Sequence, residues 1–239
     1  MPSGVDERLH LLGLAEYLQL PPPLVEQLLH RSLLPGQEGA GLWNFDRAEV
    51  DCWLDLGMPG WHRDELHAVA TTQRKTMPSL TAALQRGNVL LDLAVRDARQ
   101  CLERVVTTLD LPPSVDRPGL LQRLVAREQL SSTAMDGGFA IPHTSRTGPR
   151  LVSRNVVAFV RTARPIAFGS PDGGLSDILF LVLASDQAAH LVLLARVANL
   201  CKFPLMGRAL RVAATPGEVV DVLDRAEQWL FARRRDEQR

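Results

Sequence analysis

The sequence lacks the residues and motifs that mark several common classes of protein. Its 239 residues include three cysteines, Cys52, Cys101 and Cys201, which lie far apart and form no Cys-x-x-Cys pair. This number and spacing suggest neither a disulfide framework nor a zinc site. The sequence also contains no P-loop, no Gly-x-Gly-x-x-Gly stretch and no His-Glu-x-x-His motif, so nucleotide binding is unsupported. We therefore expect a protein without a metal site and without a cofactor.

An excess of charge of one sign and a long apolar run are missing too. The 27 Lys and Arg residues balance the 27 Asp and Glu residues, so the chain has no overall charge that would attract a polyanion. No apolar run reaches the length of a membrane span, and the N-terminus has no basic region followed by an apolar stretch. We expect a cytoplasmic protein with no membrane insertion. Because 46% of the residues are apolar, the chain can form a sizeable core without disulfides.

The most informative stretch runs from Gly138 to His143. A double glycine, Gly137-Gly138, introduces a short apolar run, and His143 directly follows Pro142. Proline fixes its own φ, so the backbone that enters His143 is stiff. An apolar run of this kind suits an extended segment that packs on a core. An imidazole at the rim of such a segment is held in place yet reachable, which is what phosphoryl or proton transfer requires of a nucleophile.

Residues 1–58 have the pattern of a small separate unit. We expect helices over 11–18, 24–30 and 47–56 and a short strand over 42–45. Asp46, with Glu49 three residues later, forms a capping box for the third helix. This order of elements resembles an excisionase-like or MerR-like winged helix-turn-helix domain. Residues 59–78 carry glycine, proline, tryptophan and mixed charges without clear periodicity, so we predict a linker there, with room for one helix.

The remainder of the chain alternates strand and helix signals, which predicts an α/β domain. Two continuous apolar runs, 156–160 and 178–183, have the pattern of strands that are covered on both faces. Further signals place a strand at 88–92 and helices near 95–109, 120–130, 191–201 and 216–230. The last of these helices begins with a capping box at Thr215 and Glu218. We expect this domain to span 79–230 and a charged, solvated tail to follow over 231–239.

The segment from Arg127 to His143 closely resembles the phosphorylation-site signature of enzyme IIA domains of the fructose/mannitol class. These domains belong to the bacterial phosphoenolpyruvate-dependent sugar phosphotransferase system, and nitrogen-regulatory enzyme IIA is in the same family. The resemblance runs from about Pro78 to about Trp229 and rests on an arginine, a Ser-Thr pair, a glycine and a Pro-His at the family's spacing. It implies the enzyme IIA type-2 fold, a mixed β-sheet flanked by helices. Here that fold would follow a small, mostly α-helical winged helix-turn-helix-like domain.

The resemblance implies a catalytic set of three residues. His143 stands at the position of the family's phosphoryl acceptor, and a neutral imidazole with an ordinary pKa of about 6.5 is a good nucleophile near neutral pH. Arg127 matches an arginine whose planar fork suits two phosphate oxygens. His190 matches a second histidine at the start of a helix, where backbone N–H groups favour anions. The alternatives are a structural histidine at 143, a surface histidine at 190 and a solvated salt bridge for Arg127.

Three hydroxyl residues complete the candidate phosphate site. Ser132 and Thr133 match the family's Ser-Thr pair, whose hydroxyls would bind the phosphate or hold Arg127. Ser132 is equally well explained as a turn residue. Thr144 stands where the family usually has glycine, so its side chain would either add a hydroxyl contact or narrow the access of a donor.

The charge of the N-terminal unit disfavours DNA binding. The first 60 residues contain three arginines and nine acidic residues, a net charge of −6. The expected recognition helix over 24–30 has neither lysine nor arginine, so the electrostatic attraction to phosphates is missing. We therefore interpret the unit as a helix-turn-helix shape that is reused for protein contact or dimerisation.

Four functions remain open from the sequence. The first is a regulatory phosphocarrier that takes a phosphoryl group on His143 from a histidine phosphocarrier protein and then binds a regulated target differently. The second is a sugar-transport component that passes the group to a permease IIB domain. The third is a transcription factor whose DNA binding is set by phosphorylation of His143, and the fourth is a binding module that has lost phosphotransfer. The sequence favours the first, because it contains no IIB-like cysteine motif and no membrane segment.

Overall fold

A mixed five-stranded sheet forms the centre of the larger part of the molecule. The computed structural model describes residues 8–31, 34–39, 42–56, 62–72, 79–144, 152–170 and 172–237. The strand order is β4-β7-β8-β6-β5, in which β4 is parallel to β7, β7 is antiparallel to β8 and β6 is parallel to β8. The strands are β4 (Leu84–Leu93), β5 (Ala134–Met135), β6 (Phe139–Ala140), β7 (Val156–Ala167) and β8 (Leu175–Leu183). The predicted α/β class with a mixed sheet is therefore confirmed.

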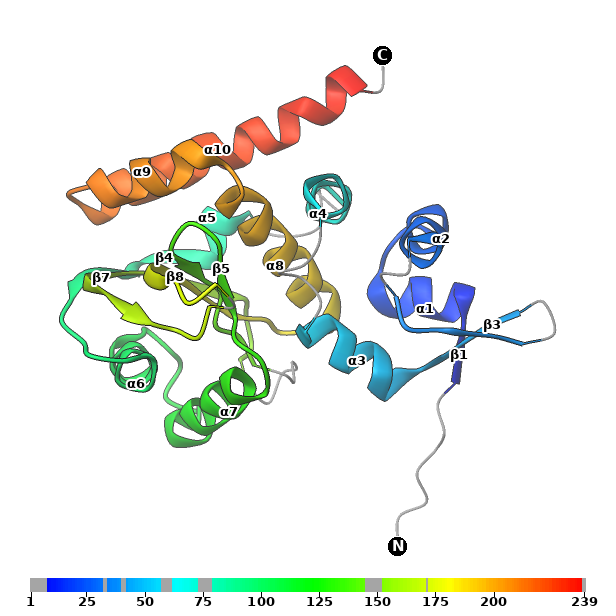
Figure 1. Cartoon of the computed structure of the whole chain (residues 1–239), viewed down its shortest axis with the longest axis horizontal. Coiled ribbons are helices and arrows are strands. Elements are labelled where there is room, and N and C mark those ends of the chain that lie inside the picture. Colours follow the sequence, from blue (N-terminus) through cyan, green and yellow to red (C-terminus); the bar gives the residue numbers. More distant parts are fainter. Residues whose placement is uncertain are drawn as a thin grey trace, which may run out of the picture.

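Helices cover both faces of this sheet, as Figure 1 shows. The side chains of β7 alternate between two cores: Val156 and Ala158 pack with helices α6 (Ala98–Thr108) and α7 (Arg117–Leu130). Val157 and Phe159 point to the opposite face and pack with α8 (Gln187–Cys201). Short α5 (Leu80–Ala83), α9 (Pro204–Val212) and α10 (Pro216–Glu237) lie on this second side. Burial on both faces explains why β7 and β8 have continuous apolar sequences.

The N-terminal unit has its own three-stranded antiparallel sheet. Its elements are β1 (Arg8–His10), α1 (Leu11–Leu18), α2 (Pro22–His30), β2 (Gln37–Gly39), β3 (Leu42–Asp46) and α3 (Arg47–Leu56), and the strand order is β1-β3-β2. The predicted cap is present, because Asp46 Oδ1 accepts the backbone N–H of Glu49 at 3.0 Å. The first strand was not predicted, since three residues are too few to show an alternating pattern and β1 exists only through its pairing with β3.

Helix α4 (Arg63–Ala70) lies within the span predicted as a linker and packs on α8, with Leu66, Val69 and Ala70 buried. Every residue of α8 from Ala188 to Cys201 is buried, because the sheet covers one side of this helix while α1 and α4 cover another (Figure 1). At the centre of this contact the guanidinium of Arg196 donates from Nε to the carbonyl of Ala70 at 2.9 Å. The same guanidinium pairs with Glu227 on α10 at 3.5 Å. Residues 62–72 are thus anchored to the larger part of the molecule.

The last helix begins as predicted but ends later. The backbone N–H of Glu218 donates to Thr215 Oγ1 at 3.2 Å, and the Glu218 carboxylate accepts the N–H of Ala214 at 2.8 Å. The helix continues to Glu237, with Phe231 buried. The span 231–239, expected as a solvated tail, therefore begins inside a helix.

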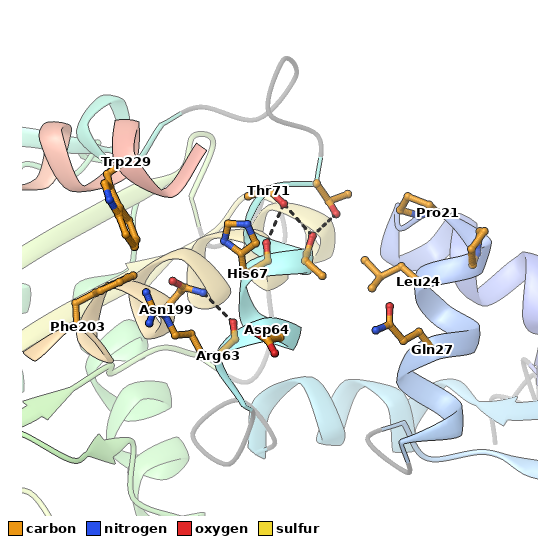
Figure 2. A pocket seen from close by; sticks show the side chains of 13 residues that line it. Pro21, Leu24, Gln27, Arg63, Asp64, His67, Thr71, Asn199, Phe203 and Trp229 are labelled. Carbon is orange, nitrogen blue, oxygen red and sulfur yellow. Dashed lines mark hydrogen bonds between the residues drawn. The ribbon is translucent and has the colours of Figure 1, made fainter. Parts of the chain in front are cut away.

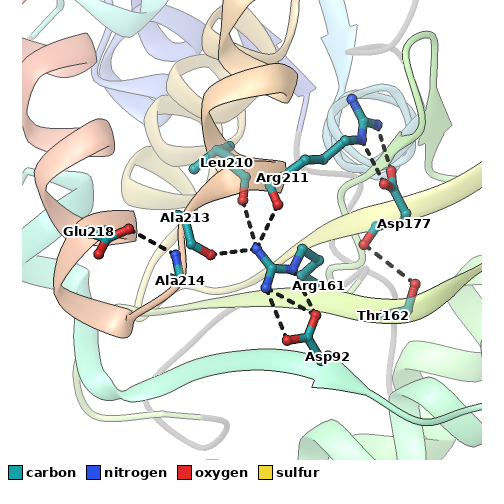
Figure 3. Close-up of polar contacts among 9 residues, drawn as sticks. All are labelled: Asp92, Arg161, Thr162, Asp177, Leu210, Arg211, Ala213, Ala214 and Glu218. Carbon is teal, nitrogen blue, oxygen red and sulfur yellow. Dashed lines mark hydrogen bonds and ion pairs between the residues drawn. The ribbon is translucent and has the colours of Figure 1, made fainter.

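A largely buried arginine, Arg161, joins the sheet to the C-terminal end of α9, as Figure 3 shows. Arg161 on β7 makes two bonds of 3.1 Å to the carboxylate of Asp92. Its Nη1 also donates to the carbonyls of Leu210, Arg211 and Ala213 at 3.3, 2.9 and 2.6 Å. Leu210 and Arg211 lie in the last turn of α9 and Ala213 is its C-cap residue, so no helical N–H is left to satisfy these carbonyls.

Among the residues that the structure describes, no single helix has the length and hydropathy of a membrane span. The segments Gln187–Cys201 and Leu205–Val212 reach them only together, across a bend of 91°.

Candidate functional site

His143 lies where β6 has just ended, beside the central strand β8. The backbone N–H of Val182 on β8 donates to the carbonyl of Pro142 at 2.9 Å, and His143 forms a parallel bridge with Val182. The Nδ1 atom of His143 lies 2.7 Å from the carbonyl oxygen of Ile141. Because a carbonyl oxygen only accepts, Nδ1 must carry the proton, and in the neutral ring Nε2 then carries the lone pair. The local chain therefore selects the nucleophilic atom.

Arg127 meets that lone pair from the last turn of α7. Its Nε–H donates to His143 Nε2 at 3.2 Å, and its Nη1 donates to the carbonyl of Ser131 at 2.7 Å. The side chain is 1% exposed and the side chain of His143 is 4% exposed. An arginine is always protonated, so its donation to Nε2 requires the neutral form of the His143 ring. Arg127 is thus in place to stabilise negative charge that arrives at Nε2.

His190 completes a cluster of three basic side chains. It lies in the first turn of α8, whose N-cap Asp186 accepts the backbone N–H of Ala189 at 2.8 Å. The centroid of its ring is 5.3 Å from that of His143, with 60° between the ring planes. Burial lowers the pKa of His190 well below 6.5, and the charges of His143, when that ring is protonated, and of Arg127 lower it further. His190 is therefore neutral at physiological pH and can offer one N–H to an anion.

The hydroxyls of Ser132 and Thr133 already have partners inside the protein. Ser132 Oγ donates to the carbonyl of Phe168 at 2.6 Å and accepts the N–H of Ala134 at 3.0 Å. Thr133 Oγ1 donates to Glu128 at 2.6 Å. The two hydroxyl protons hold the loop that follows α7, and the expected contact of these hydroxyls with phosphate stays a prediction.

Thr144 lies directly after His143, and its side chain is buried, 1% exposed. The residues that follow it, 145–151, lie outside the described part of the chain.

Sequence reasoning missed Glu128. This carboxylate follows Arg127 and accepts two hydrogen bonds from Thr133, at 2.8 Å and 2.6 Å. Burial raises its pKa, whereas the bonds from Thr133 and Ser132 and the charge of Arg127 lower it. An acidic residue near the end of a helix is usually solvated, so only the five-residue spacing to Thr133 could have drawn attention to it.

A large cleft of about 770 Å³ lies elsewhere in the molecule. Its lining includes Leu24 of α2, His67 of α4, Trp229 of α10 and Phe203, which lies between α8 and α9. Figure 2 shows these side chains around the cleft. It contains none of the three basic side chains of the candidate site. The described residues also contain no group of three or more histidine, cysteine or acidic side chains that is arranged to hold a metal ion.

Comparison with known proteins agrees with this geometry. Residues 82–226 match the family described as "Phosphoenolpyruvate-dependent sugar phosphotransferase system, EIIA 2". A nitrogen regulatory protein of Bradyrhizobium diazoefficiens is 32% identical over 137 residues, which cover 56% of this chain and 88% of that protein. The crystal structure of nitrogen regulatory protein IIA-Ntr from Neisseria meningitidis has a TM-score of 0.56 and 27% identity over 60% of this chain and 98% of that chain.

A more distant structure shares the fold alone. The complex of enzyme IIAMtl with phosphorylated enzyme IIBMtl from Escherichia coli contains a chain with a TM-score of 0.51 and 17% identity, over 59% of this chain and 98% of that chain. The family match covers more than half of the sequence and includes Arg127, His143 and His190. The chain therefore belongs to the EIIA type-2 family of the phosphoenolpyruvate-dependent phosphotransferase system.

Proposed function

We propose that this protein is a regulatory phosphocarrier of the phosphotransferase system, related in role to nitrogen-regulatory enzyme IIA, and that His143 accepts the phosphoryl group. The observation that carries the proposal is the pair of contacts on one imidazole: Nδ1–H is bound to the Ile141 carbonyl, and the Nε2 lone pair faces Arg127. The relatives named nitrogen regulatory protein support the regulatory role. Phosphoenolpyruvate as the first donor places the relay in the cytoplasm.

The proposed step is a transfer between two imidazoles. Nε2 of His143 attacks the phosphorus of a phosphohistidine on the donor, a histidine phosphocarrier protein, and the N–P bond of the donor breaks. The electron pair of that bond returns to the donor imidazole, so no metal and no further reactant is required. Arg127 turns its N–H groups from Nε2 to the phosphoryl oxygens, and neutral His190 donates a hydrogen bond to them. Since both sides of the reaction are phosphoramidates, catalysis consists of alignment and charge stabilisation.

Access to the ring is part of the proposal. The side chain of His143 is only 4% exposed, so a donor must displace covering residues before Nε2 can attack. Ser132 and Thr133 act in this scheme as supports of the loop, and Thr144 lies at the acceptor where it tunes access or adds a hydroxyl contact.

We assign residues 1–58 to a winged helix-turn-helix-like unit that contacts protein, followed by a linker over 59–78 that contains α4. The element order and the acidic charge of residues 1–58 support this assignment. In addition, Leu24 and Gln27 of α2 face the cleft that α4 also lines (Figure 2). On α3, Asp51 accepts a hydrogen bond from Tyr17 at 2.6 Å and one from Gln187 of α8 at 3.4 Å. Gln187 lies one turn before His190, so this contact links the unit to the phosphorylation site. Salt-dependent retention of the full chain on DNA would instead favour a transcription factor.

The experiment is phosphorylation by the relay. The full chain is incubated with labelled phosphoenolpyruvate, enzyme I and the histidine phosphocarrier protein, and the expected product is an acid-labile phosphoprotein. His143→Ala should take no label. Absence of label on the wild type, or equal label on His143→Ala, overturns the proposal.

A second candidate function is sugar transport, in which the group passes on to a permease IIB domain. The Escherichia coli complex of a IIA protein with phosphorylated IIB favours it. Deletion of the protein would then abolish growth on one particular sugar, whereas a regulator leaves growth on every single sugar in place.

A further inference from the structure

A closed circuit of hydrogen bonds and covalent links runs through the candidate site and includes Glu128. His143 Nδ1–H donates to the Ile141 carbonyl at 2.7 Å, and the Ile141 N–H donates to the Thr133 carbonyl at 3.0 Å. Thr133 in turn donates its N–H to Glu128 Oε1 at 2.8 Å and its Oγ1–H to Glu128 Oε2 at 2.6 Å. Glu128 is covalently joined to Arg127, whose Nε–H returns to His143 Nε2 at 3.2 Å. The circuit therefore constrains both nitrogens of the acceptor ring.

Glu128 also determines where the loop after α7 turns. By holding Thr133, its carboxylate folds residues 131–133 back toward the helix end. The carbonyl of Ser131 then accepts Arg127 Nη1 at 2.7 Å. The guanidinium is thus held at two points, the Ser131 carbonyl and His143 Nε2, and the first of these depends on the turn.

We propose that Glu128 is a positioning residue for phosphoryl transfer: its carboxylate closes the circuit that holds the guanidinium of Arg127 and the imidazole of His143 in reactive geometry. This inference rests on the proposed function, because it concerns the same acceptor. Glu128 touches neither the acceptor nitrogen nor the incoming phosphoryl group and acts only through Thr133 and the backbone.

An ionised carboxylate suits this contact, because Thr133 presents two donors and each carboxylate oxygen accepts one of them. In Glu128→Gln the amide oxygen can still accept the Thr133 N–H, but the NH₂ group obliges Thr133 Oγ1 to accept instead of donate. Glu128→Gln therefore replaces two charge-assisted bonds by weaker neutral ones, with almost no change in side-chain size.

The test compares Glu128→Gln with the wild type in relay phosphorylation of the full chain. Glu103→Gln, an exposed glutamate on α6, is the matched control for loss of a negative charge. We expect the rate constant at saturating carrier protein to fall about 10- to 100-fold in Glu128→Gln, because small displacements of reacting groups have effects of this size. The KM for the carrier protein should stay within about twofold, because the docking surface is unchanged.

Two further measurements separate positioning from general stability. Thr133→Val removes the hydroxyl and should slow transfer like Glu128→Gln, while Thr133→Ser keeps the hydroxyl and should transfer at close to the wild-type rate. Nitrogen-15 spectra of the His143 ring should show one tautomer in the wild type and a mixture of tautomers in Glu128→Gln. A residue that only stabilised the fold would lower the melting temperature without moving either the rate of the folded protein or the tautomer.

The outcomes are distinguishable. A wild type that takes no label overturns the proposed function and this inference together. A labelled wild type with Glu128→Gln at the wild-type rate overturns this inference alone, as does a loss confined to the KM. If Glu128→Gln fails to fold, the Thr133→Val and Thr133→Ser pair decides, and equal rates for the two variants overturn the inference.

Discussion

The rings of His143 and His190 lie 5.3 Å apart, although the whole hairpin of β7 and β8 separates the two residues in the sequence. The sheet order explains the proximity. β6 is parallel to β8, so the ends of both strands lie at the same edge of the sheet. His143 follows β6 directly, and α8 with His190 follows β8 after a turn capped by Asp186. The two imidazoles meet there because parallel neighbouring strands deliver their following residues to one edge.

Replacement of Arg127 by lysine tests the role of the planar guanidinium. Lysine keeps the charge but cannot reach His143 Nε2 and the Ser131 carbonyl together. We expect the rate of His143 phosphorylation to fall about 100-fold, as for the loss of one preorganised donor. Arg123→Lys, on the exposed side of the same helix, should retain the wild-type rate. Equal rates for the two variants would contradict the assigned role of Arg127.

The buried His190 predicts a specific loss of stability in acid. Its pKa lies well below 6.5 in the folded protein, through burial first and then through the charges of His143, when protonated, and Arg127. Below about pH 6.5 the unfolded chain therefore binds a proton on His190 that the folded chain does not bind. The free energy of unfolding then falls as the pH falls below this value, by about 1.4 kcal/mol per pH unit. Above that value the contribution of His190 is constant.

Urea unfolding at about pH 7.5 and about pH 5.5 measures this loss. The wild type should lose roughly 1 kcal/mol more between the two conditions than His190→Gln. His30→Gln, which alters an exposed histidine of α2, should lose as much as the wild type. An identical loss in the wild type and His190→Gln would show that His190 is not held neutral by the fold.

We predict that a side chain at position 138 lowers the free energy of unfolding. The φ of Gly138 is +84°, and a Cβ there would lie 2.6 Å from Arg211 Nη2 and 2.8 Å from Asp177 Oδ1, within the ion pair that joins α9 to β8. Gly173 has a similar φ of +73° but nothing within 4 Å of a Cβ. Both alanine variants incur about 1–2 kcal/mol for the left-handed backbone, and Gly138→Ala should lose about 1 kcal/mol more from steric overlap. Chemical denaturation of both variants checks the difference, and equal losses would contradict it.

The protein contains one tyrosine, which makes the contact between α1 and α3 directly measurable. Burial, and then the hydrogen bond to Asp51, raise the pKa of Tyr17 from 10.0 to about 12. The ultraviolet absorbance of tyrosinate should therefore stay low through pH 10. Asp51→Asn should shift the titration down by about one unit, whereas Glu49→Gln, at an exposed position of the same helix, should leave it unchanged. A wild-type midpoint near 10 would mean that Tyr17 and Asp51 are not in contact in solution.

The sequence alone predicted the types of most elements and indicated His143 as the candidate acceptor. Apolar periodicity and capping residues are local, so they predicted α8, α10 and the two central strands closely, and the spacing from Arg127 to His143 indicated the phosphorylation motif. The extension of α10 to Glu237 and the strand β1 were missed, because they depend on packing of Phe231 and on pairing with β3, respectively.

Only the tertiary structure decided how the site is assembled. The order of the strands brings His190 beside His143, and the turn after α7 commits Ser132 and Thr133 to Phe168 and Glu128. These contacts join residues that are distant in the sequence or that face one another across a turn. A one-dimensional pattern does not encode such contacts, because they depend on the spatial order of whole elements rather than on the preference of any single residue.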